Sequence, residues 1–487
     1  MCGIVAIQGK HTEKELHEMV KILRHRGPDD KGFFTKGNIS LGQTRLSIID
    51  VAGGHQPIFN EDKTKCIVFN GEIYNFRILK EQLKRIHKFS TKTDTEIILH
   101  LYEEDGPECI KKLDGMFTFA IYDNGKLFIG RDRLGIKPLY YGTKDKTVYF
   151  ASELKALLHC SYITTFLPGY YYTSDKGCVK YYEIPKGVSI GTSEGNILKM
   201  IESLLIKAVE KRLMSDVPVG VFLSGGIDSS IIAAIMRKRI PGLHSFSVGM
   251  KGSKDLEYAR EVAKFLDLKH YELVYTVDEM IFALPEIIYY LESYDAPLVR
   301  SAIPCYFVSK LAHQHVKVVL TGEGADELFS GYKYLSEIRD EKALFDELFR
   351  ITYNLHNTNL QRVDRLTMAN SVEGRVPFLD IEFLTYIFSI PVKLKYSHEN
   401  QEKRLLREAF KEYLPTSIVN RPKQKFSDGA GSMEVFKKIA EDQITDDDFR
   451  KENNNKARTK EELFYYRIFK KFYPDSILNC IGKTEVF

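Results

Sequence analysis

The sequence has 487 residues, of which 44% are hydrophobic and 28% are charged. This length and composition are typical of a soluble globular chain with two or three domains, and they argue against global disorder. The net charge of +4 comes from 70 basic and 66 acidic side chains. So small an excess does not favour a nucleic-acid or a membrane partner.

The seven cysteines are scattered along the chain, and none forms a CxxC pair. An odd number of cysteines in a long chain favours a reducing compartment over a disulfide framework, and their spacing suggests no zinc site. The start of the chain lacks a basic n-region, and no apolar run approaches the roughly 18 residues that span a bilayer. We therefore expect a cytoplasmic protein without a membrane anchor. The oligomeric state stays open, with a homodimer as one option.

The first part of the chain contains short β-branched and aromatic runs bounded by Gly, Asn and Asp, which predict strands. The predicted strands are 2–8, 39–48, 65–69, 116–122 and 126–130. Two predicted helices interrupt them. One begins at Thr12, with Glu15 completing a capping box, and the other begins near Asp94. Strands with a few helices packed on them predict a layered α+β domain.

The pattern changes after a segment rich in Gly, Ser and Pro at 180–196, where we place a domain boundary. The predicted domains are therefore 2–188 and 196–487. In the second domain, apolar runs at 217–223, 243–248, 271–274 and 317–320 alternate with helical patterns. This alternation predicts an α/β domain with a parallel sheet covered on both faces. After Gly331 the pattern is mostly helical.

Cys2 becomes the N-terminal residue once Met1 is removed. It would then carry both a thiol and an α-amine whose ordinary pKa is about 7.7–8.0. Such an amine can accept the thiol proton, so Cys2 could act as an N-terminal nucleophile without a histidine partner. The alternative is a buried thiol at the start of a strand, and Cys2 on its own does not decide between the two.

Four polar or glycine residues at predicted strand and helix ends support the nucleophile hypothesis. Arg45 could pair with a substrate carboxylate, and Asp94 could accept hydrogen bonds from an ammonium group. Asn70 and the Gly71 amide could donate to an oxyanion. Each residue also has an ordinary alternative role, with Asp94 as a helix cap, Arg45 in a surface ion pair and Gly71 in a turn. Together they would recognise a free amino acid and stabilise attack on its side-chain amide.

The segment SGGIDSS at 224–230 follows a predicted strand and precedes a predicted helix at 231–239. Its glycines allow a sharp turn, Ser229 or Ser230 could cap the helix, and the helix N-terminus favours an anion. This predicts a phosphate cradle that differs from the Walker type, because the chain has no GxxxxGK[ST] segment. Asp228 could contact phosphate only through a cation, which implies Mg²⁺. The alternative is a plain Gly-rich turn.

A second acidic segment, TGEGADE at 321–327, follows another predicted strand. If both strands belong to one parallel sheet, their carboxyl ends place this segment near SGGIDSS. Its acids could cap a helix, or beside ATP they could hold Mg²⁺ and transfer protons.

Five segments resemble the glutaminase domain of the class II glutamine amidotransferases: MCGIVAI, RHRGPDD, RLSIID, FNGEIYN and GRDRLGIKPLYY. They occur in that family's order over residues 2–155. The resemblance implies an αββα sandwich of the N-terminal-nucleophile hydrolase type, with Cys2 as nucleophile and Asn70 and Gly71 as oxyanion hole. The glutamine-binding residues that it implies are Arg45, Leu46, Ser47, Ile48, Ile49, Asn70, Gly71, Glu72 and Asp94.

The SGGIDSS loop resembles the pyrophosphate-binding loop of enzymes that split ATP to AMP and pyrophosphate. Together with HSFSVG, TGEGADELFSGY, SVEGRVPFLD and RPKQKFSDG, it makes the chain similar to the glutamine-hydrolysing asparagine synthetases. That resemblance implies substrates glutamine, aspartate and ATP, a β-aspartyl-AMP intermediate, and an internal channel for ammonia. The ATP-binding residues that it implies are Leu223, Ser224, Gly225, Gly226, Asp228, Ser229, Ser230, Val248, Thr321, Gly322 and Lys423.

Further roles follow from the same resemblance. Glu323 should assist formation or breakdown of the adenylate, and Asp228 and Asp326 should coordinate Mg²⁺. Lys423 should neutralise phosphate or transition-state charge. Arg300 and Arg375 are candidates near the aspartate and the phosphates.

The chain departs from the family at three positions. Thr321 stands where the family commonly has Ser, which retains the hydroxyl. Pro297 and Leu298 occupy positions that are threonines in a bacterial pattern. This departure motivates a second hypothesis, in which the same chemistry acts on another adenylated carboxylate. A third hypothesis, a non-catalytic binding protein on this scaffold, is disfavoured by the intact Cys2 and SGGIDSS.

Overall fold

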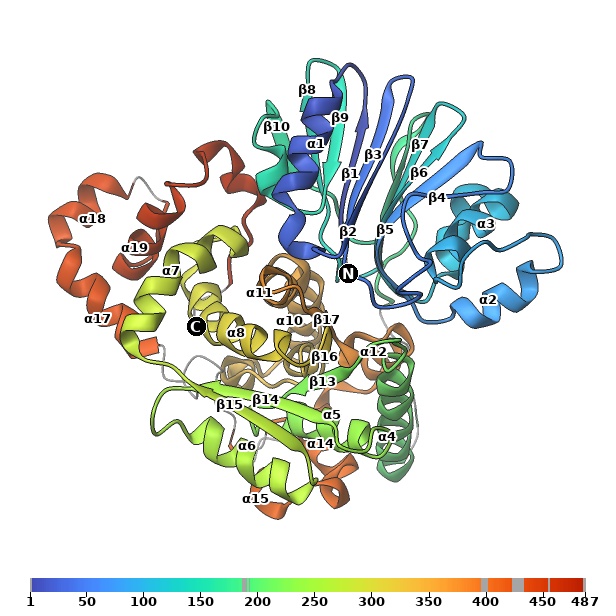
Figure 1. Ribbon diagram of the computed structural model, residues 1–487. Coiled ribbons are helices and arrows are strands. Elements are labelled where there is room, and N and C mark those ends of the chain that lie inside the picture. The colour runs from blue at the N-terminus through green and yellow to red at the C-terminus, as the bar shows by residue number, and fades with distance from the viewer. Residues whose placement is uncertain are drawn as a thin grey trace.

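The computed structural model describes residues 2–185, 191, 193–395, 402–422, 433–453 and 456–484. It consists of an N-terminal part with two sheets and a C-terminal part with one sheet (Figure 1). The N-terminal strands are β1 (Cys2–Gln8), β2 (Asp30–Lys36), β3 (Ile39–Arg45), β4 (Ile58–Phe59), β5 (Lys65–Ile73), β6 (Gly115–Asp123), β7 (Lys126–Arg131), β8 (Tyr140–Lys144), β9 (Thr147–Ala151), β10 (Tyr162–Thr165), β11 (Tyr170–Thr173) and β12 (Gly177–Lys180). One sheet has the order β10-β8-β9-β1-β3-β2, and the other has the order β12-β11-β7-β6-β5-β4.

Alternate residues of β1 face different layers, as the two-residue period of a strand requires. Ile4 belongs to the apolar cluster between the two sheets, together with Val68 of the second sheet. Val5 packs in the cluster that contains Leu16 of α1 (Glu13–Ile22). Helices α2 (Phe76–Leu83) and α3 (Thr95–Asp105) share a buried cluster with the outer face of the second sheet. The predicted αββα sandwich is therefore confirmed.

The predicted boundaries of local elements hold at some positions and fail at others. The capping box of α1 is present, because the Thr12 side chain accepts from the Glu15 N–H at 3.2 Å and Glu15 accepts from the Thr12 N–H at 2.8 Å. Strand β3 ends at Arg45 instead of residue 48. Strand β5 continues to Ile73, although its last residues include an Asn and a Gly that favour turns.

The C-terminal sheet is parallel, with the order β15-β14-β13-β16-β17. Its strands are β13 (Val219–Phe222), β14 (His244–Gly249), β15 (Lys269–Val274), β16 (Val318–Leu320) and β17 (Glu373–Arg375). The main helices are α4 (Glu194–Lys211), α5 (Ile227–Arg237), α6 (Lys254–Phe265), α7 (Val277–Leu291), α8 (Ala296–His313), α10 (Glu341–Asn354) and α11 (Asn359–Ala369).

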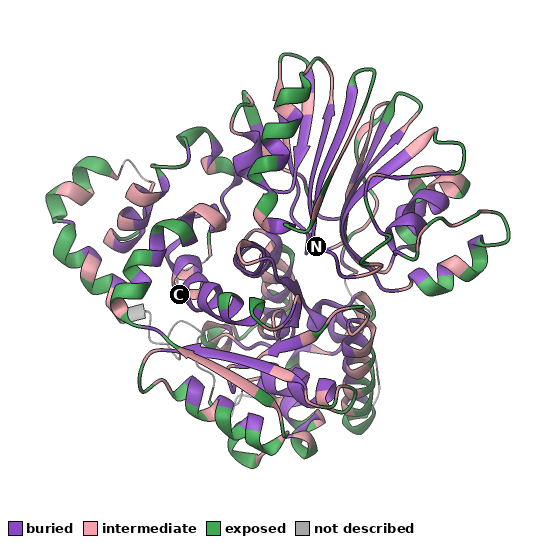
Figure 2. Cartoon of the chain, in the orientation of Figure 1, coloured by how far each residue is buried: buried purple, intermediate pink, exposed green. Residues whose placement is uncertain are grey.

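Helices cover both faces of this sheet. Leu320 of β16 packs in a buried cluster with residues of α4, α5 and α6. Its neighbour Val319 packs in another cluster with residues of α7 and α8. In Figure 2 the strands are mostly buried, whereas the outer helices carry exposed residues on their outward faces. The predicted parallel sheet covered on both faces is therefore confirmed.

The C-terminal portion after Gly331 is mostly helical, as predicted, but the sequence did not indicate β17, which adds a fifth strand beside β16. The remaining helices are α9 (Ala325–Leu328), α12 (Ile381–Ser389), α13 (Val392–Lys395), α14 (Arg404–Ala409), α15 (Thr416–Val419), α17 (Met433–Gln443), α18 (Asp446–Glu452) and α19 (Lys460–Phe469). Among the described residues, no helix has the length and apolar character needed to cross a membrane.

Candidate active sites

Cys2 lies at the start of β1 with only 6% of its surface exposed. Its backbone nitrogen donates to Oδ1 of Asn70 at 3.0 Å, and its Sγ accepts from Nε2 of Gln43 at 2.9 Å. Burial raises the pKa of the Cys2 thiol above its ordinary value. Since a nucleophilic thiol must lose its proton, the site needs a base, which the α-amine of a processed Cys2 would supply.

Asn70 and Gly71 lie inside β5, not after it as we expected. Asn70 is fully buried, and its Nδ2 has no hydrogen-bond partner in the described part of the chain. Gly71 pairs with Phe117 and has a φ of 155°, and a Cβ at this position would collide with the carbonyl oxygen of Met116. This excludes the turn role for Gly71. The Asn70 Nδ2 group is an unused donor next to Cys2, which fits an oxyanion hole.

Arg45 is opposite Cys2 in the β1–β3 ladder. It is not in a surface ion pair, because its guanidinium donates to the carbonyl oxygens of Ile49 at 3.2 Å, Asp50 at 2.7 Å and Val51 at 3.2 Å. Arg45 therefore holds the shape of the loop that follows β3. This loop contains the four predicted glutamine-binding residues Leu46, Ser47, Ile48 and Ile49.

The same loop contacts the C-terminal domain. Leu46 and Ile48 are buried in one apolar cluster with Val318 of β16 and Met368 of α11. The N–H of Asp50 donates to the Asp216 carboxylate at 2.8 Å. The predicted glutamine-binding loop is thus packed directly on the second domain.

Asp94 precedes α3, but its carboxylate does not cap that helix. Instead its Oδ2 accepts from the N–H of Ile73 at 2.7 Å, so it faces the end of β5 that carries Gly71. Burial raises the pKa of Asp94 to about 7. A buried carboxylate of this kind is stabilised when a positive group binds to it, as the ammonium of an amino acid would.

Glu72 points into the boundary between the domains, where its carboxylate lies 3.1 Å from the Arg375 guanidinium. The same guanidinium lies 2.6 Å from Glu373. One cation therefore serves two buried carboxylates. Burial raises the pKa of Glu72 well above its ordinary value, whereas at Glu373 the charge of Arg375 helps to outweigh burial and the pKa is lowered. Arg375 is wholly buried and does not line the large cavity described next. Its place near the aspartate and the phosphates stays a prediction: its side chain pairs with Glu72 at the domain boundary, while its carbonyl oxygen accepts from the N–H of Thr321.

A cavity of about 980 Å³ opens at the carboxyl ends of β13, β14 and β16. This is the edge of a parallel sheet where ligands bind. Of the residues predicted for the second site, those that line it are Leu223, Ser224, Gly226, Asp228, Ser229, Val248, Arg300, Thr321, Gly322, Glu323 and Asp326. Gly225 and Ser230 belong to the same loop without lining the cavity, and Lys423 lies outside the described residues.

The loop at the start of α5 differs from the prediction in its cap. Gly226 occupies the N-cap position, so Ser229 and Ser230 lie within the first turn and neither caps the helix. Ser229 instead accepts from the Ser224 N–H at 3.2 Å and so folds the loop back on itself. Gly225 has a φ of 67°, and its missing Cβ leaves room for Tyr258. The N-terminus of α5 therefore opens on the cavity, as a phosphate site requires.

Asp228 and Asp326 come together as predicted, and a residue that we did not predict joins them. The Lys403 ammonium lies 2.5 Å from Asp228 and 2.6 Å from Asp326. Two carboxylates that already share one cationic nitrogen are a donor set that fits Mg²⁺. No sequence motif indicates Lys403, because it lies far along the chain from both aspartates.

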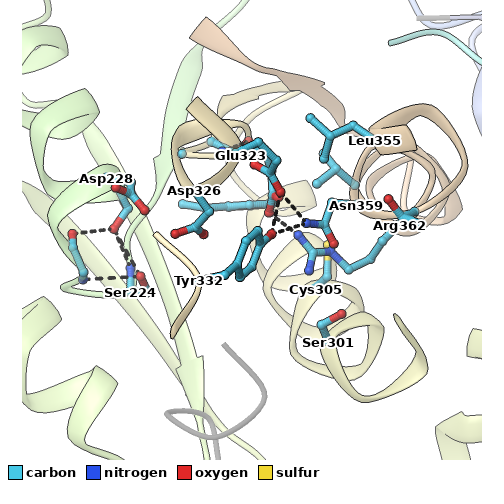
Figure 3. A pocket seen from close by; sticks show the side chains of 18 of the residues that line it. Ser224, Asp228, Ser301, Cys305, Glu323, Asp326, Tyr332, Leu355, Asn359 and Arg362 are labelled. Carbon is cyan, nitrogen blue, oxygen red and sulfur yellow. Dashed lines mark hydrogen bonds and ion pairs between the residues drawn. The ribbon is translucent and has the colours of Figure 1, made fainter. Parts of the chain in front are cut away.

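Two acids of the TGEGADE segment have partners at the cavity, Arg362 of α11 and Tyr332, which precedes α10 (Figure 3). Glu323 forms an ion pair with Arg362, and Glu327 accepts from Tyr332 at 2.5 Å. Burial raises the pKa of Glu327 to about 7. Arg362 lines the cavity and carries no sequence signal, since only the packing of α11 beneath β16 brings it there.

The segment that departs from the family pattern lies at the start of α8. Pro297 lines the cavity, whereas Leu298 is buried and does not line it. Arg300 also lines the cavity and pairs with Glu461 of α19 at 2.7 and 2.8 Å. Of the two altered positions, only Pro297 can therefore touch a ligand in the cavity.

Comparisons with known proteins give a family for each part of the chain. The family model described as "Glutamine amidotransferase domain" matches residues 1–168, and the model described as "Asparagine synthase" matches residues 200–349 and 336–483. The fold and its two sites thus define a glutamine amidotransferase joined to an ATP-dependent ligase domain.

A probable asparagine synthetase [glutamine-hydrolyzing] of Schizosaccharomyces pombe is 40% identical over 100% of this chain and 96% of its own length. Asparagine synthetase B [glutamine-hydrolyzing] of Escherichia coli is 39% identical over 99% and 93%. Asparagine synthetase [glutamine-hydrolyzing] 3 of Arabidopsis thaliana is 40% identical over 98% and 88%. The chain belongs to the family of glutamine-hydrolysing asparagine synthetases, which are ligases.

Proposed function

We propose that this chain converts aspartate to asparagine, with glutamine as nitrogen donor and ATP as the activating substrate. The observation that carries the proposal is that one chain holds both a candidate glutaminase site and a candidate nucleotide cavity. Cys2 and Asn70 lie together in the sandwich, and Asp228, Asp326 and Glu323 line the cavity of the parallel-sheet domain. The products are asparagine, glutamate, AMP and pyrophosphate.

In the first site the Cys2 thiolate attacks the side-chain amide carbon of glutamine, after its proton has passed to the α-amine. Asn70 Nδ2 and the Gly71 N–H donate to the oxyanion that forms. The amine returns the proton to the leaving nitrogen, which departs as ammonia, and water then hydrolyses the thioester to glutamate. Arg45 binds the substrate carboxylate, and Asp94 binds its ammonium group with help from Glu72.

In the cavity, the loop at 224–230 and the N-terminus of α5 hold the phosphates of ATP. Leu223 and Val248 contact the adenine, and Thr321 and Gly322 contact the nucleotide. A β-carboxylate oxygen of aspartate attacks the α-phosphorus, and pyrophosphate leaves. Ammonia then attacks the activated carbonyl carbon, AMP leaves, and Glu323 accepts a proton.

Four further residues support this chemistry. Asp228 and Asp326 would hold Mg²⁺, which neutralises phosphate charge when it is bound. Arg362 is a positioning residue, because its ion pair with Glu323 fixes that carboxylate in the cavity. Lys423 is assigned to phosphate or transition-state charge, as the family resemblance implies.

We infer that ammonia passes between the sites inside the molecule. The N-terminus lies at the face of the sandwich that meets the C-terminal domain (Figure 1). Arg26 donates to the Cys2 carbonyl oxygen at 2.9 Å and to the Asp364 carboxylate of α11 at 2.8 and 3.1 Å. These buried contacts exclude water from the junction around Cys2, which favours transfer of ammonia without loss to solvent.

The functional units that we assign are the glutaminase unit 2–188 and the synthetase unit 196–487. Strand β12 ends at Lys180 and helix α4 begins at Glu194, which supports a boundary between them. We place the protein in the cytoplasm, because all seven cysteines are free thiols, and a reducing compartment keeps them so.

The acceptor is tested by isotope exchange between pyrophosphate and ATP, with aspartate compared against glutamate and other small carboxylic acids. We expect exchange that depends on aspartate and on Mg²⁺. Exchange that is independent of aspartate would contradict the assignment of aspartate as the acceptor. Exchange supported by another acid would favour the alternative acceptor that Pro297, facing the cavity, motivates.

A further inference from the structure

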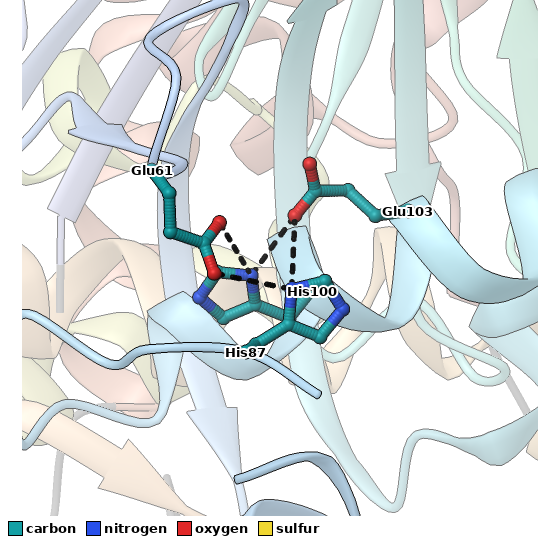
Figure 4. Close-up of side chains that lie close together, drawn as sticks. All are labelled: Glu61, His87, His100 and Glu103. Carbon is teal, nitrogen blue, oxygen red and sulfur yellow. Dashed lines mark hydrogen bonds and ion pairs between the residues drawn. The ribbon is translucent and has the colours of Figure 1, made fainter. Parts of the chain in front are cut away.

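A cluster of two histidines and two glutamates lies in the sandwich, outside both sites described above (Figure 4). Glu61 belongs to the turn between β4 and β5, His87 to the segment between α2 and α3, and His100 and Glu103 to α3. One ligand atom from each of the four residues lies within 4.8 Å of the others. Three separate pieces of chain therefore present nitrogen and oxygen donors to one point.

The distances between these donors fit a single tetrahedral ion. Zinc bonds of about 2.0–2.1 Å place neighbouring ligand atoms about 3.3 Å apart. His87 Nδ1 lies 3.3 Å from Glu61 and 3.7 Å from Glu103, and His100 Nδ1 lies 2.9 Å from Glu103 and 3.8 Å from Glu61. These four distances bracket the value for zinc, with Glu61 presenting Oε1 to His87 and Oε2 to His100. A rotation of the Glu61 carboxylate and small shifts of the other side chains would bring one donor of each residue onto one ion.

The other ring nitrogen of each histidine also faces a carboxylate. His87 Nε2 lies within hydrogen-bond distance of Glu104 at 3.0 Å, whereas His100 Nε2 lies 3.7 Å from Glu96 and forms no hydrogen bond to it. A zinc-bound histidine typically donates its second N–H to such a carboxylate, which orients the ring and raises its basicity. A lone surface ion pair between histidine and glutamate would need only one of these contacts. The two rings are also stacked, with centroids 4.4 Å apart, so both Nδ1 atoms are held on the same side.

We propose that Glu61, His87, His100 and Glu103 form a structural Zn²⁺ site. Two carboxylates and two neutral imidazoles neutralise a divalent ion, and four protein ligands leave no open position for catalysis. Their mix of imidazole and carboxylate donors suits zinc better than Mg²⁺. No sequence motif indicates this site, because its ligands come from three unrelated segments and include no cysteine.

The site would fasten the segment between α2 and α3 to the β4–β5 turn. That segment leads directly into Asp94, the residue assigned to the substrate ammonium. Zinc would therefore stabilise the sandwich and fix the start of α3, and it would take no part in the chemistry at Cys2.

The test measures zinc bound by the full-length chain in competition with a chromophoric chelator, in a large excess of Mg²⁺ that fills oxygen-only sites. We expect one Zn²⁺ per chain and a rise in thermal midpoint on its addition. Glu104→Gln should weaken zinc binding about 10- to 100-fold, and His87→Gln should weaken it further. The matched control is His270→Gln, because His270 is similarly buried and faces a single carboxylate, Glu272, at 3.2 Å.

The result that would overturn the proposal is equal zinc affinity in wild type and His87→Gln, or an equal loss in His270→Gln. Circular dichroism and retained glutaminase activity show that each variant is folded. Co²⁺ bound to the chain gives a second, spectroscopic measurement of the same site. Wild type should show the intense visible absorption of four-coordinate Co²⁺, and His87→Gln should lose it. Only the weak bands of six-coordinate Co²⁺ in wild type would contradict the site.

Discussion

The Glu72 carboxylate of β5 lies 3.1 Å from the Arg375 guanidinium of β17, and this ion pair joins the two domains. The carbonyl oxygen of Arg375 accepts from the N–H of Thr321 at 2.9 Å. Arg375 therefore contacts Glu72, a candidate glutamine-binding residue, through its side chain and Thr321, a candidate nucleotide-binding residue, through its backbone. Its guanidinium also pairs with Glu373 at 2.6 Å.

Replacing Arg375 with methionine should destabilise the fold by about 3–5 kcal/mol, because it leaves a buried carboxylate without a cation. The opposite pKa shifts of the two acids assign most of the negative charge to Glu373. We therefore expect Glu373→Gln to restore much of the stability of Arg375→Met, whereas Glu72→Gln restores little. Urea unfolding of the single and double variants measures this. Equal rescue by both glutamines would show that the charge is shared.

Asp94 should make glutamine binding depend on pH. Its pKa is about 7, and Asp94 binds the substrate ammonium only in its deprotonated form. Glutamine affinity should therefore fall about tenfold for each pH unit below 7. Calorimetric titration of Cys2→Ala, in which no hydrolysis occurs, isolates this binding step. Constant affinity between about pH 6 and about pH 8 would contradict the role of Asp94.

The same pKa has a consequence for stability. A raised pKa means that the folded state favours the protonated carboxyl, so the contribution of Asp94 is complete below its unfolded pKa and is lost as the pH rises through 7. Asp94→Asn removes this loss. The thermal midpoint of the variant should gain on wild type between about pH 5 and about pH 8. A difference that does not change with pH would contradict the shift.

Asp228→Asn should separate the two activities. Its carboxylate lies in the cavity and pairs with Lys403, so its loss should lower aspartate-dependent ATP–pyrophosphate exchange about 100-fold or more. Glutaminase activity, measured as glutamate release, should persist because Cys2 belongs to the other domain. The matched control is Asp267→Asn, since Asp267 is exposed and pairs with Arg237 on the surface, away from the cavity. An equal loss of both activities would contradict the division of labour.

Gly71→Ala tests the strand geometry of the oxyanion hole. The new Cβ would collide with the Met116 carbonyl oxygen at a φ that disfavours side chains, so β5 must shift away from β6. We expect glutaminase activity to fall together with the thermal midpoint, while ammonia-dependent synthesis persists. Gly191→Ala is the control, because its Cβ would meet open space. Full glutaminase activity in Gly71→Ala would contradict the role of Gly71 in the oxyanion hole.

The sequence predicted features that depend on local pattern. The capping box at Thr12 and the strand–turn–helix around Asp228 are written in neighbouring residues, and both are confirmed. It could not predict contacts between distant segments. Lys403 reaches Asp228 only because α14 packs near the carboxyl ends of the strands, and Arg375 turns away from the cavity only because Glu72 and Glu373 surround it. The strand predicted over 65–69 is shorter than β5 because Asn and Gly residues favour turns. Pairing with β6 holds Asn70 and Gly71 in the extended strand.

The central claim is that the amide nitrogen released at Cys2 is incorporated into aspartate bound in the cavity. The most direct measurement is mass spectrometry of asparagine formed from amide-¹⁵N glutamine, aspartate, ATP and Mg²⁺ in the presence of unlabelled ammonium. We expect wild type to give asparagine that is predominantly ¹⁵N-labelled, and Cys2→Ala to give only unlabelled asparagine from the ammonium. Labelled asparagine from Cys2→Ala, or no asparagine from wild type, would contradict the account.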